Sequence, residues 1–550
     1  MENSNVKKDI KKEFLYKIFL IIAIIVAINF ISLRIFTRLD LTKNKTYTLS
    51  DASKEIVKQL EDNFEIRAYF SNDLPYPFNT IKQDVKDFLS DYRSYSNGKI
   101  NYVFISPSDD DQNNEVFKEA QKFGIQPFPV GSKAKQEIRN VLMGLVVLYQ
   151  GKTETIQLTR NTVTGQVVPT VADLEYELTS IIKKLATEKK KKIGFLTGHD
   201  EYEYSKMNTI SNAMNRYYDV VNINLSSNTP ISEDVYVLVV FGPKREIPDW
   251  QRYLIDQYIM RGGNVLWLID KIYPNYQQQM TLGNVFELGL DSMLLNYGIK
   301  INNDLLRDLQ CAQVSVQTSI GIPLPMSYPF FPVVTNINKD INAFKNIEYV
   351  TLQFASTLDL KAAETIGIKA IPILKSSQKA GVATGFFILN IEQFQNLTRS
   401  KADSIFNQGD FVLAAEYIGK FKSYYDGKEV PKDTTPNSTP PNIQQKNQCD
   451  RDVRMIVVTD ADFANEEKRP GPENINFFLN LVDYLADDVG LSEIRSKMTS
   501  ETPINEAELS PAKKTFIKYF DLIFPPIVVL LLGLYIWNRK KARRKKMQEN

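Results

Sequence analysis

The stretch VYVLVVFGPKREIPDWQRYLIDQYIMRGGNVLWLID, residues 235–270, decides the fold. It begins and ends with apolar runs, 235–241 and 265–270, and residues 248–260 between them have the length and spacing of a helix. Near-continuous apolar strands that alternate with helices are typical of a parallel sheet covered on both faces. The sequence therefore predicts an α/β fold for this part of the chain.

The same alternation extends on both sides of this stretch and predicts a larger α/β domain over residues 189–492, with irregular insertions. Its other predicted strands and helices are 193–197, 205–217, 220–225, 453–460 and 474–485. Residues 271–354 have no clear pattern, and their proline-rich stretches, 323–325 and 329–332, predict loops. Residues 433–450 form a polar, proline-rich excursion.

A smaller α/β domain is predicted over residues 40–188, where strand, helix, strand, helix and hairpin follow one another. The predicted segments are a helix from Ser50 as N-cap, 64–70, 80–95, 99–105, 114–123, the hairpin 141–149 with 154–158, and a helix 172–188. This order is similar to a thioredoxin-like fold. The redox C-x-x-C motif is absent, so such a fold would be a scaffold without redox chemistry. Four lysines, 189–192, suit the end of the last helix and a solvated domain boundary.

Two charge-free runs of 16 residues, Ile18–Leu33 and Leu522–Trp537, lie near the two ends of the chain. Each gives about 24 Å of helix, and apolar flanking residues supply the rest of a roughly 30 Å hydrocarbon core. The sequence therefore predicts transmembrane helices over 18–36 and 518–538. No small-residue cleavage pattern follows the first run, which favours an uncleaved anchor over a signal peptide.

The charge distribution predicts the topology. Both tails, 1–17 and 539–550, are rich in lysine and arginine, which places both termini in the cytoplasm and the main body outside the inner membrane, in the periplasm. Residues 493–517 then form a membrane-proximal segment. Residues 1–38 carry seven basic and three acidic side chains and residues 539–550 carry seven and one, so the body has a net charge of −8 in a chain of +2. An acidic body argues against nucleic acid as a partner, whereas the basic tails suit anionic lipid headgroups.

One group of residues suggests chemistry. His199 is the chain's single histidine, and it follows a predicted strand beside Asp200 and Glu201. Asp270 and Asp460 stand at the ends of neighbouring predicted strands, where open α/β sheets place their ligands. A hydrolase or metal interpretation would combine these carboxylates with the imidazole. The alternative, which we favour, is that His199 caps the following helix or contacts a loop.

Other motifs of known chemistry are absent from the sequence. There is no G-x-S-x-G elbow and no Walker A motif. Gly262-Gly263 precedes a strand rather than opening a helix, which predicts a helix C-cap. Residues 460–465 lack the glycine and distal glutamate of a calcium loop. One histidine and two cysteines, Cys311 and Cys449, exclude the usual zinc sites, although the cysteines could pair with each other. We therefore predict no catalytic residue, no cofactor and no metal.

Several segments together resemble a known family. They are Leu39–Thr42 with Lys45 and Tyr47–Ser50, Phe195–Glu201, the stretch from Asp256 through Gly262-Gly263 to Asp270, Asp460–Phe463, and Asn474–Asn480. In this order, and with two predicted anchors, the chain resembles the GldG-type gliding-motility auxiliary component of an ABC transporter in Bacteroidota. The resemblance covers nearly the whole chain. Asp200 departs from it, because glycine is expected there.

The resemblance implies a partner ATPase and permease, and a role in gliding and in the linked type IX secretion system. It implies a second domain similar to glutamine-amidotransferase-like folds, whose nucleophilic cysteine has no counterpart here, and it supplies no active site. We expect a non-catalytic, substrate-binding accessory subunit that contacts membrane lipids and other envelope proteins. Gly533, Pro525 and Pro526 would allow close packing of the second anchor. The alternatives are an envelope hydrolase or small-ligand-binding enzyme using His199, Asp200 and Glu201, and a purely structural tether.

Overall fold

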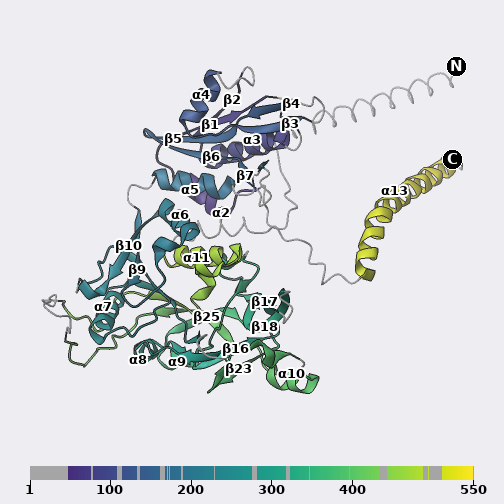
Figure 1. Cartoon of the computed structure of the whole chain (residues 1–550). Helices are drawn as coiled ribbons and strands as arrows, with labels where there is room; N and C mark the ends of the chain where they lie inside the picture. The colour runs from purple at the N-terminus through teal and green to yellow at the C-terminus, as the bar shows by residue number, and fades with distance from the viewer. Residues whose placement is uncertain are drawn as a thin grey trace, which may run out of the picture. The chain divides into compact units, whose positions relative to one another are not determined.

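In the computed structural model the chain forms two compact units, residues 1–499 and 500–550, which are treated separately below (Figure 1). The predicted first anchor, 18–36, the tail before it and most of the membrane-proximal segment lie outside the described residues. The described residues are 48–72, 74–75, 78–107, 114–132, 137–161, 167–169, 171, 174–186, 190–227, 229–275, 281–317, 323–345, 347–395, 397–432, 443–486, 494 and 511–548.

The N-terminal part of the first unit is built on a four-stranded sheet of order β2-β1-β5-β6. Strand β1 runs parallel to β2 and antiparallel to β5, and β5 pairs antiparallel with β6. A parallel pair needs a crossover connection, which helix α3 supplies. The predicted elements are present, but the hairpin β3–β4 was not predicted. The elements are α2 (Asp51–Lys58), β1 (Phe64–Phe70), α3 (Phe78–Tyr95), β2 (Ile100–Ile105), α4 (Glu115–Lys122), β3 (Phe128–Ser132), β4 (Glu137–Val141), β5 (Met143–Tyr149), β6 (Lys152–Gln157), β7 (Thr159–Asn161), β8 (Val167–Pro169) and α5 (Leu174–Ala186).

A buried polar cluster joins helices α2 and α5. As predicted, Ser50 is the N-cap of α2, and its hydroxyl accepts a hydrogen bond from the amide of Ser53. The Glu175 carboxylate accepts from the Ser50 amide at 2.6 Å and from the Ser53 hydroxyl at 2.7 Å. Buried polar groups must be paired in this way, so the Ser50 end of the first resembling segment has a structural role here.

The larger part of the first unit contains a ten-stranded sheet whose first five strands, β10-β9-β11-β12-β26, are all parallel. Numbered along the chain, these five strands have the doubly wound order 2-1-3-4-5, with its switch point between β9 and β11. Strand β25 then pairs antiparallel with β26 and begins a mixed extension. The predicted α/β class is confirmed. The core elements are β9 (Lys191–Thr197), α6 (Asn208–Tyr217), β10 (Tyr218–Asn224), β11 (Val235–Phe241), α7 (Asp249–Met260), β12 (Asn264–Leu268), β25 (Val412–Gly419), β26 (Val453–Val458) and α11 (Pro472–Leu485).

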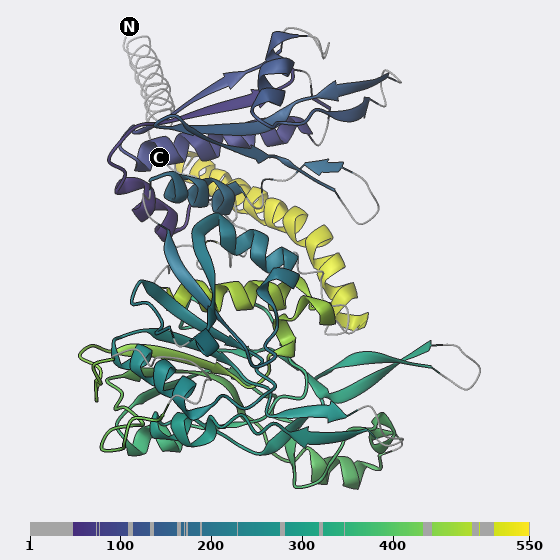
Figure 2. The same ribbon diagram turned by 60° about the vertical axis from the view of Figure 1, so that its left-hand side comes forward.

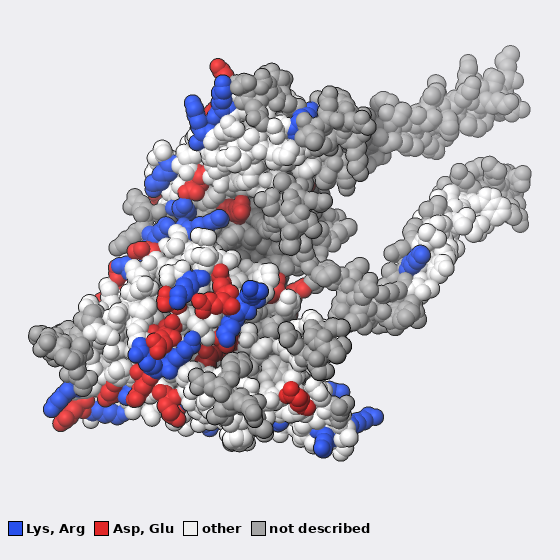
Figure 3. All heavy atoms as spheres, viewed as in Figure 1, with Lys and Arg blue, Asp and Glu red and all other residues white. Residues whose placement is uncertain are grey.

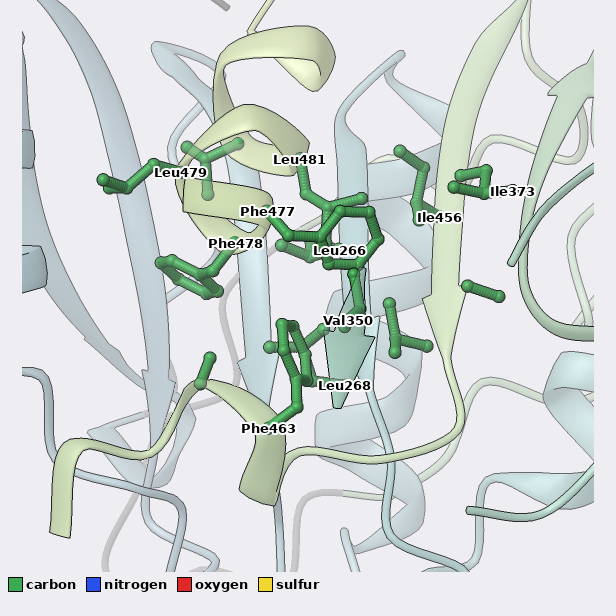
Figure 4. Close-up of a cluster of buried hydrophobic side chains, with 14 of the residues drawn as sticks. Leu266, Leu268, Val350, Ile373, Ile456, Phe463, Phe477, Phe478, Leu479 and Leu481 are labelled. Carbon is green, nitrogen blue, oxygen red and sulfur yellow. The ribbon is translucent and has the colours of Figure 1, made fainter. Parts of the chain in front are cut away.

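Both faces of the parallel strands are buried, as the apolar runs predict. Leu266 and Leu268 of β12 face one core, which is covered by α6 and α11, and Trp267 faces the other, which is covered by α7. Figure 4 shows Phe477 and Phe478 of α11 in the first core, with Leu266 and Leu268 of β12 beside them. Full burial of each such side chain contributes about 1.5–3 kcal/mol, so this sheet forms the centre of the domain.

The loops predicted at the proline-rich stretches 323–325 and 329–332 are wrong, because both lie in the long strand β18 (Pro323–Val334). Strand β18 pairs antiparallel with β17 (Cys311–Gln317), and near its end with β20 (Val350–Thr351). Proline is tolerated in a strand where its nitrogen faces solvent at a sheet edge, and over 323–327 β18 is paired with β17 only.

The remaining described elements of the first unit are the four short strands that complete the ten-stranded sheet, β15, β19, β21 and β22, and the short strands and helices around it. They are η1 (Tyr204–Lys206), η2 (Leu225–Ser227), β13 (Ile272–Asn275), β14 (Leu282–Val285), α8 (Asp291–Asn296), β15 (Lys300–Ile301), β16 (Asp304–Asp308), β19 (Asn336–Ile337), η3 (Asn342–Phe344), β21 (Leu358–Asp359), α9 (Lys361–Thr365), β22 (Lys369–Lys375), β23 (Ala380–Thr384), β24 (Phe387–Ile388), η4 (Ile391–Phe394), α10 (Arg399–Ile405), η5 (Asp462–Ala464) and η6 (Glu466–Lys468).

The second unit is the long helix α13 (Pro511–Gln548). Within it, Lys518–Arg539 is long and apolar enough to cross a membrane, with 22 residues and a mean hydropathy of 2.1. Pro525, Pro526 and Gly533 all lie in this span. Apart from the adjoining residues and the backbone of its own helix, no heavy atom lies within 4 Å of the position that a Cβ on Gly533 would occupy, so the glycine is open to contact.

Candidate functional site

The loop after β9 holds its histidine inside the protein. His199 is 3% exposed, and its Nδ1 and Nε2 lie 2.8 Å from Glu201 Oε1 and 2.6 Å from Gln251 Oε1. The His199 amide also donates to Glu201 Oε2 at 2.6 Å. Burial opposes ionisation of Glu201, but these hydrogen bonds from His199 outweigh it and lower the pKa of the carboxyl. The two ring nitrogens therefore connect the loop to the start of α7.

Asp200 occupies a backbone conformation that favours glycine. Its φ is +60°, which is a left-handed conformation, and this explains why the resembling family is expected to have glycine there. Arg245 binds the exposed carboxylate through two nitrogens, at 2.8 and 2.9 Å. The ion pair therefore spans the loops that follow β9 and β11.

Backbone hydrogen bonds close the same two loops over the switch point. The His199 carbonyl accepts from the amides of Lys244 at 2.8 Å and Arg245 at 3.1 Å. Sheets of this order bind ligands between these two loops, and here the two loops are hydrogen-bonded to each other.

Three aspartates gather beyond the ends of β12 and β26. Asp270 Oδ1 accepts from the Ala461 amide at 2.6 Å, and Asp460 Oδ2 accepts from the Gln353 amide at 2.6 Å. Asp460 is fully buried, and its Oδ1 has no hydrogen-bond partner. Burial and the charge of Asp462 raise the pKa of Asp270 to about 7. Burial and the charge of Asp270 raise the pKa of Asp460 well above its usual range.

Tyr202 and two lysines complete this group, and sequence reasoning missed all three. The Tyr202 hydroxyl donates to Asp462, and burial followed by the nearby carboxylates raises the pKa of the phenol, which stays neutral. The Lys244 ammonium lies 4.0 Å from the centre of the Tyr202 ring, and Lys468 lies 3.8 Å from Asp462. The sequence offered one signal for Tyr202, which directly follows the candidate residue Glu201.

The predicted site residues thus divide into two groups. His199 and Glu201 bond to each other and to Gln251, whereas Asp270 and Asp460 interact with backbone amides and with Asp462. Within the residues that the structure describes, no group of three histidine, cysteine, aspartate or glutamate side chains could hold a metal ion. The arrangement can hold a proton among the aspartates, and it presents no accessible imidazole.

The two cysteines do not pair. Both thiols are free; Cys449 is buried and donates to the Ile259 carbonyl at 3.3 Å. Burial raises the pKa of the Cys449 thiol to about 11 and also raises that of Cys311. A thiol with a raised pKa has little thiolate and is a poor nucleophile.

A groove of about 1310 Å³ lies at the opposite edge of the sheet, where the parallel strands begin. Its cations bind the carbonyl ends of the covering helices: Lys190 binds Asn215 of α6, Arg451 binds Gly262 after α7, and Lys191 binds Ala486 after α11. Cations are stabilising at helix C-termini, so these side chains serve the fold. The charged residues that line the groove are Lys190, Lys191, Lys192, Arg261, Arg451, Arg454, Asp219, Glu233, Asp234 and Asp452.

The glycine pair at this edge is a helix C-cap, as predicted. The Gly262 and Gly263 amides donate to the carbonyls of Ile259 and Tyr258, which is the Schellman pattern, and Gly262 has φ +96°. A Cβ on Gly263 would lie 2.2 Å from the Tyr258 ring, so this position has no room for a side chain.

Comparison with known proteins gives one informative family. Residues 190–483 match a family model described as an ABC-type uncharacterized transport system, and residues 43–148 match a domain of unknown function, DUF7088. An uncharacterized protein of Borreliella burgdorferi is 23% identical over 526 residues, which cover 93% of this chain and 95% of that protein.

Two solved structures are similar only distantly. The mmIFT52 N-terminal domain has a TM-score of 0.32 at 12% identity, covering 54% of this chain and 97% of that domain. The exo-beta-1,4-mannosidase Op5Man5 from Opitutaceae bacterium strain TAV5 has a TM-score of 0.21 at 10% identity, covering 63% of this chain and 42% of the enzyme. Scores this low support no argument about fold or function.

Proposed function

The chain belongs to the family described as an ABC-type uncharacterized transport system, and from this premise we propose that it is a membrane-anchored, non-catalytic accessory subunit of an ABC transporter. The observation that carries the proposal is the closed switch point in the matched domain. The His199 carbonyl ties the two loops together, and both ring nitrogens of His199 are engaged in a buried position. A scaffold needs such rigidity, whereas a hydrolase needs a base within reach of a substrate.

The proposed partners are the permease and the ATPase of the same transporter. The span Lys518–Arg539 of α13 would pack against the permease in the inner membrane, and the basic tail after it would contact lipid headgroups. We propose that both termini are cytoplasmic and that the main body lies in the periplasm. There it would bind substrate or contact other envelope proteins.

The finer parts of the proposal rest on the resemblance to the GldG-type component of Bacteroidota. They are a role in gliding motility and in type IX secretion. The sheet order β2-β1-β5-β6 supports a thioredoxin-like scaffold for the small domain, and the parallel order β10-β9-β11-β12-β26 supports a glutamine-amidotransferase-like scaffold for the larger one.

The test is purification of the full-length protein from its native membranes in mild detergent, followed by mass spectrometry of the proteins that come with it. We expect an ABC ATPase and a permease, enriched at least tenfold over a mock purification. Recovery of the protein alone, or with unrelated envelope proteins, would count against the accessory role.

A matched pair of variants locates the contact in α13. Gly533→Leu fills a position that is open in this chain, so we expect it to reduce recovery of the permease several-fold without unfolding the protein. Val528→Leu adds bulk about 140° away around the helix, at 100° per residue, and should leave recovery unchanged. Equal recovery with both variants would exclude the Gly533 face as the interface.

One observation favours a second function, an envelope hydrolase or ligand-binding enzyme. Perturbed carboxyl groups such as Asp270 and Asp460 cluster at functional sites. His199→Ala does not separate the two functions, because it removes two buried hydrogen bonds and would disturb the loop. Asp460→Asn is nearly isosteric. A scaffold keeps its cellular function with this change, and an enzyme that uses the aspartate pair loses it at normal protein levels.

A further inference from the structure

The hairpin formed by β17 and β18, residues 311–334, is an arm of unusual composition. Figure 2 shows it projecting from the larger domain as a two-stranded ribbon. Its 24 residues contain no aspartate, glutamate, lysine or arginine, in a chain that is 24% charged. Proteins commonly protect exposed strands with charge, and this arm has no such protection.

The two edges of the arm differ. In the sheet order β17-β18-β20, β17 stands at the end, so its outer edge pairs with no other strand of the described chain. This edge, Cys311–Gln317, has neither proline nor charge, and its free N–H and C=O groups can accept another strand.

The outer edge of β18 is blocked by proline. Pro323 and Pro325 are both exposed and lie two residues apart, so their nitrogens face the same side of the strand. Prolines within strands place this nitrogen toward solvent, and without N–H groups they cannot donate to a neighbouring strand. The arm therefore offers one edge for pairing and closes the other.

We propose that β17 pairs antiparallel with β17 of a second copy of this chain, with Val314 at the twofold axis. In that register Gln313 lies opposite Ser315 of the second copy, and Ala312 lies opposite Val316. In these two pairs polar residues meet polar residues and apolar residues meet apolar ones, and at the ends of the strands Cys311 lies opposite Gln317. Two identical charged edges would repel each other, and β17 carries no charge that could do so.

The blocked edge makes the assembly close at two copies. Pairing gives a sheet of order β18-β17-β17-β18, and its outer edges carry the prolines, so further copies cannot add. Seven paired residues on each side bury less than the roughly 1,000 Å² of a stable soluble interface. The pairing gains strength when both copies are anchored in one membrane, a step that rests on the proposed function.

Cysteine cross-linking of the full-length protein in native membranes tests the register. In a Cys311→Ser background, Val314→Cys places two thiols directly opposite each other across the axis. The control is Leu324→Cys, which lies on the blocked strand and is more exposed than Val314, so random collision would favour it. We expect at least tenfold more disulfide-linked dimer with Val314→Cys. Equal cross-linking, or none with Val314→Cys, would overturn the proposal.

A charge placed on each edge gives an independent test. Ser315 and Ser327 are both exposed on the arm. In the Val314→Cys background, Ser315→Lys should reduce the dimer at least fivefold, and Ser327→Lys should leave it unchanged. An equal effect of the two lysines would contradict edge pairing.

The same membranes separate this proposal from the accessory function. If the ATPase and permease are recovered but the cross-link fails, edge pairing alone is wrong. If the cross-link forms but the partners are missing, the accessory function alone is wrong.

Discussion

The two edges of the parallel sheet carry opposite chemistry. At the edge where the strands end, Asp270, Asp460 and Asp462 crowd together under loops that the protein closes with its own hydrogen bonds. At the edge where the strands begin, an open groove of about 1310 Å³ is lined by six lysine and arginine side chains and by four acidic ones. The closed edge contains the unusual carboxyl groups, and the open edge contains cations bound to carbonyl groups.

The direction of the helices explains this difference. Covering helices run opposite to parallel strands, so their carbonyl ends gather where the strands begin and attract cations such as Lys190 and Arg451. The basic groove is therefore a product of the fold. The aspartate cluster has no such structural origin, since burial and the neighbouring carboxylates raise the pKa values of Asp270 and Asp460 at a cost in stability.

Figure 3 shows one face of the protein, on which basic and acidic side chains are interspersed over the described part of the larger domain. A nucleic-acid interface needs cations gathered on one face. The drawn face therefore agrees with the argument from the acidic net charge of the body.

The largest effect is expected where the cations support the fold. Glu416 is fully buried, and it accepts from Arg454 Nε at 2.9 Å and from the Tyr484 hydroxyl at 3.0 Å. Glu416→Ala removes both bonds and should lower the free energy of unfolding by about 2–3 kcal/mol, measured by urea titration. Glu416→Gln keeps one acceptor oxygen, and its NH2 group can donate to the Tyr484 hydroxyl, so this variant should cost less. Equal loss in the two variants would show that packing, and not pairing, decides stability here.

A smaller effect of opposite sign is expected at the aspartate edge. The pKa of Asp270 is about 7 in the folded protein, against 3.8 ordinarily, so the folded state binds a proton more tightly. Its contribution to stability is therefore greatest below about pH 4 and falls as the pH rises to about 7. Asp270→Asn does not ionise, so it avoids the loss of stability at high pH. We expect this variant to be more stable than the parent at pH 8 by on the order of 1–2 kcal/mol and to show no gain at pH 4.

Glu473 complicates the pH dependence of the parent protein, because burial raises its pKa to about 7 as well. Only the difference between Asp270→Asn and the parent, measured by thermal unfolding at several pH values, reports on the aspartate cluster. Glu473→Gln is the control and should leave that difference intact. A constant difference across pH would contradict the raised pKa of Asp270.

The fold of the parallel sheet was predictable because local patterns determine it. Residues 235–241 and 265–269 are largely apolar, and the structure places 235–241 and 264–268 in strands covered on both faces. The long strand β18 was missed because proline normally interrupts strands. A strand tolerates proline where no neighbouring strand pairs with it on the side of the proline nitrogen. The sequence alone does not show which side of a strand is unpaired.

The candidate site was predictable only in part. Strand ends in a parallel sheet meet at one edge, which brought Asp270 and Asp460 together as expected. The hydrogen bond of His199 to Gln251 joins residues 52 positions apart, and no sequence pattern predicts it. Burial of the histidine depends on tertiary packing and could not be predicted from the residues beside it in the sequence.

The smallest effect concerns the one residue that departs from the resembling family. Asp200→Gly and Asp200→Ala both lose the exposed ion pair with Arg245, which contributes at most about 1 kcal/mol. Glycine accepts φ +60° freely, so its loss of the pair is offset and the net change should stay within about 0.5 kcal/mol. Alanine must adopt the left-handed conformation and should be less stable than glycine by about 1 kcal/mol. The urea midpoints of the two variants measure this difference directly. If they coincide, Asp200 is under no backbone strain, and the loop after β9 keeps its shape through the His199 hydrogen bonds alone.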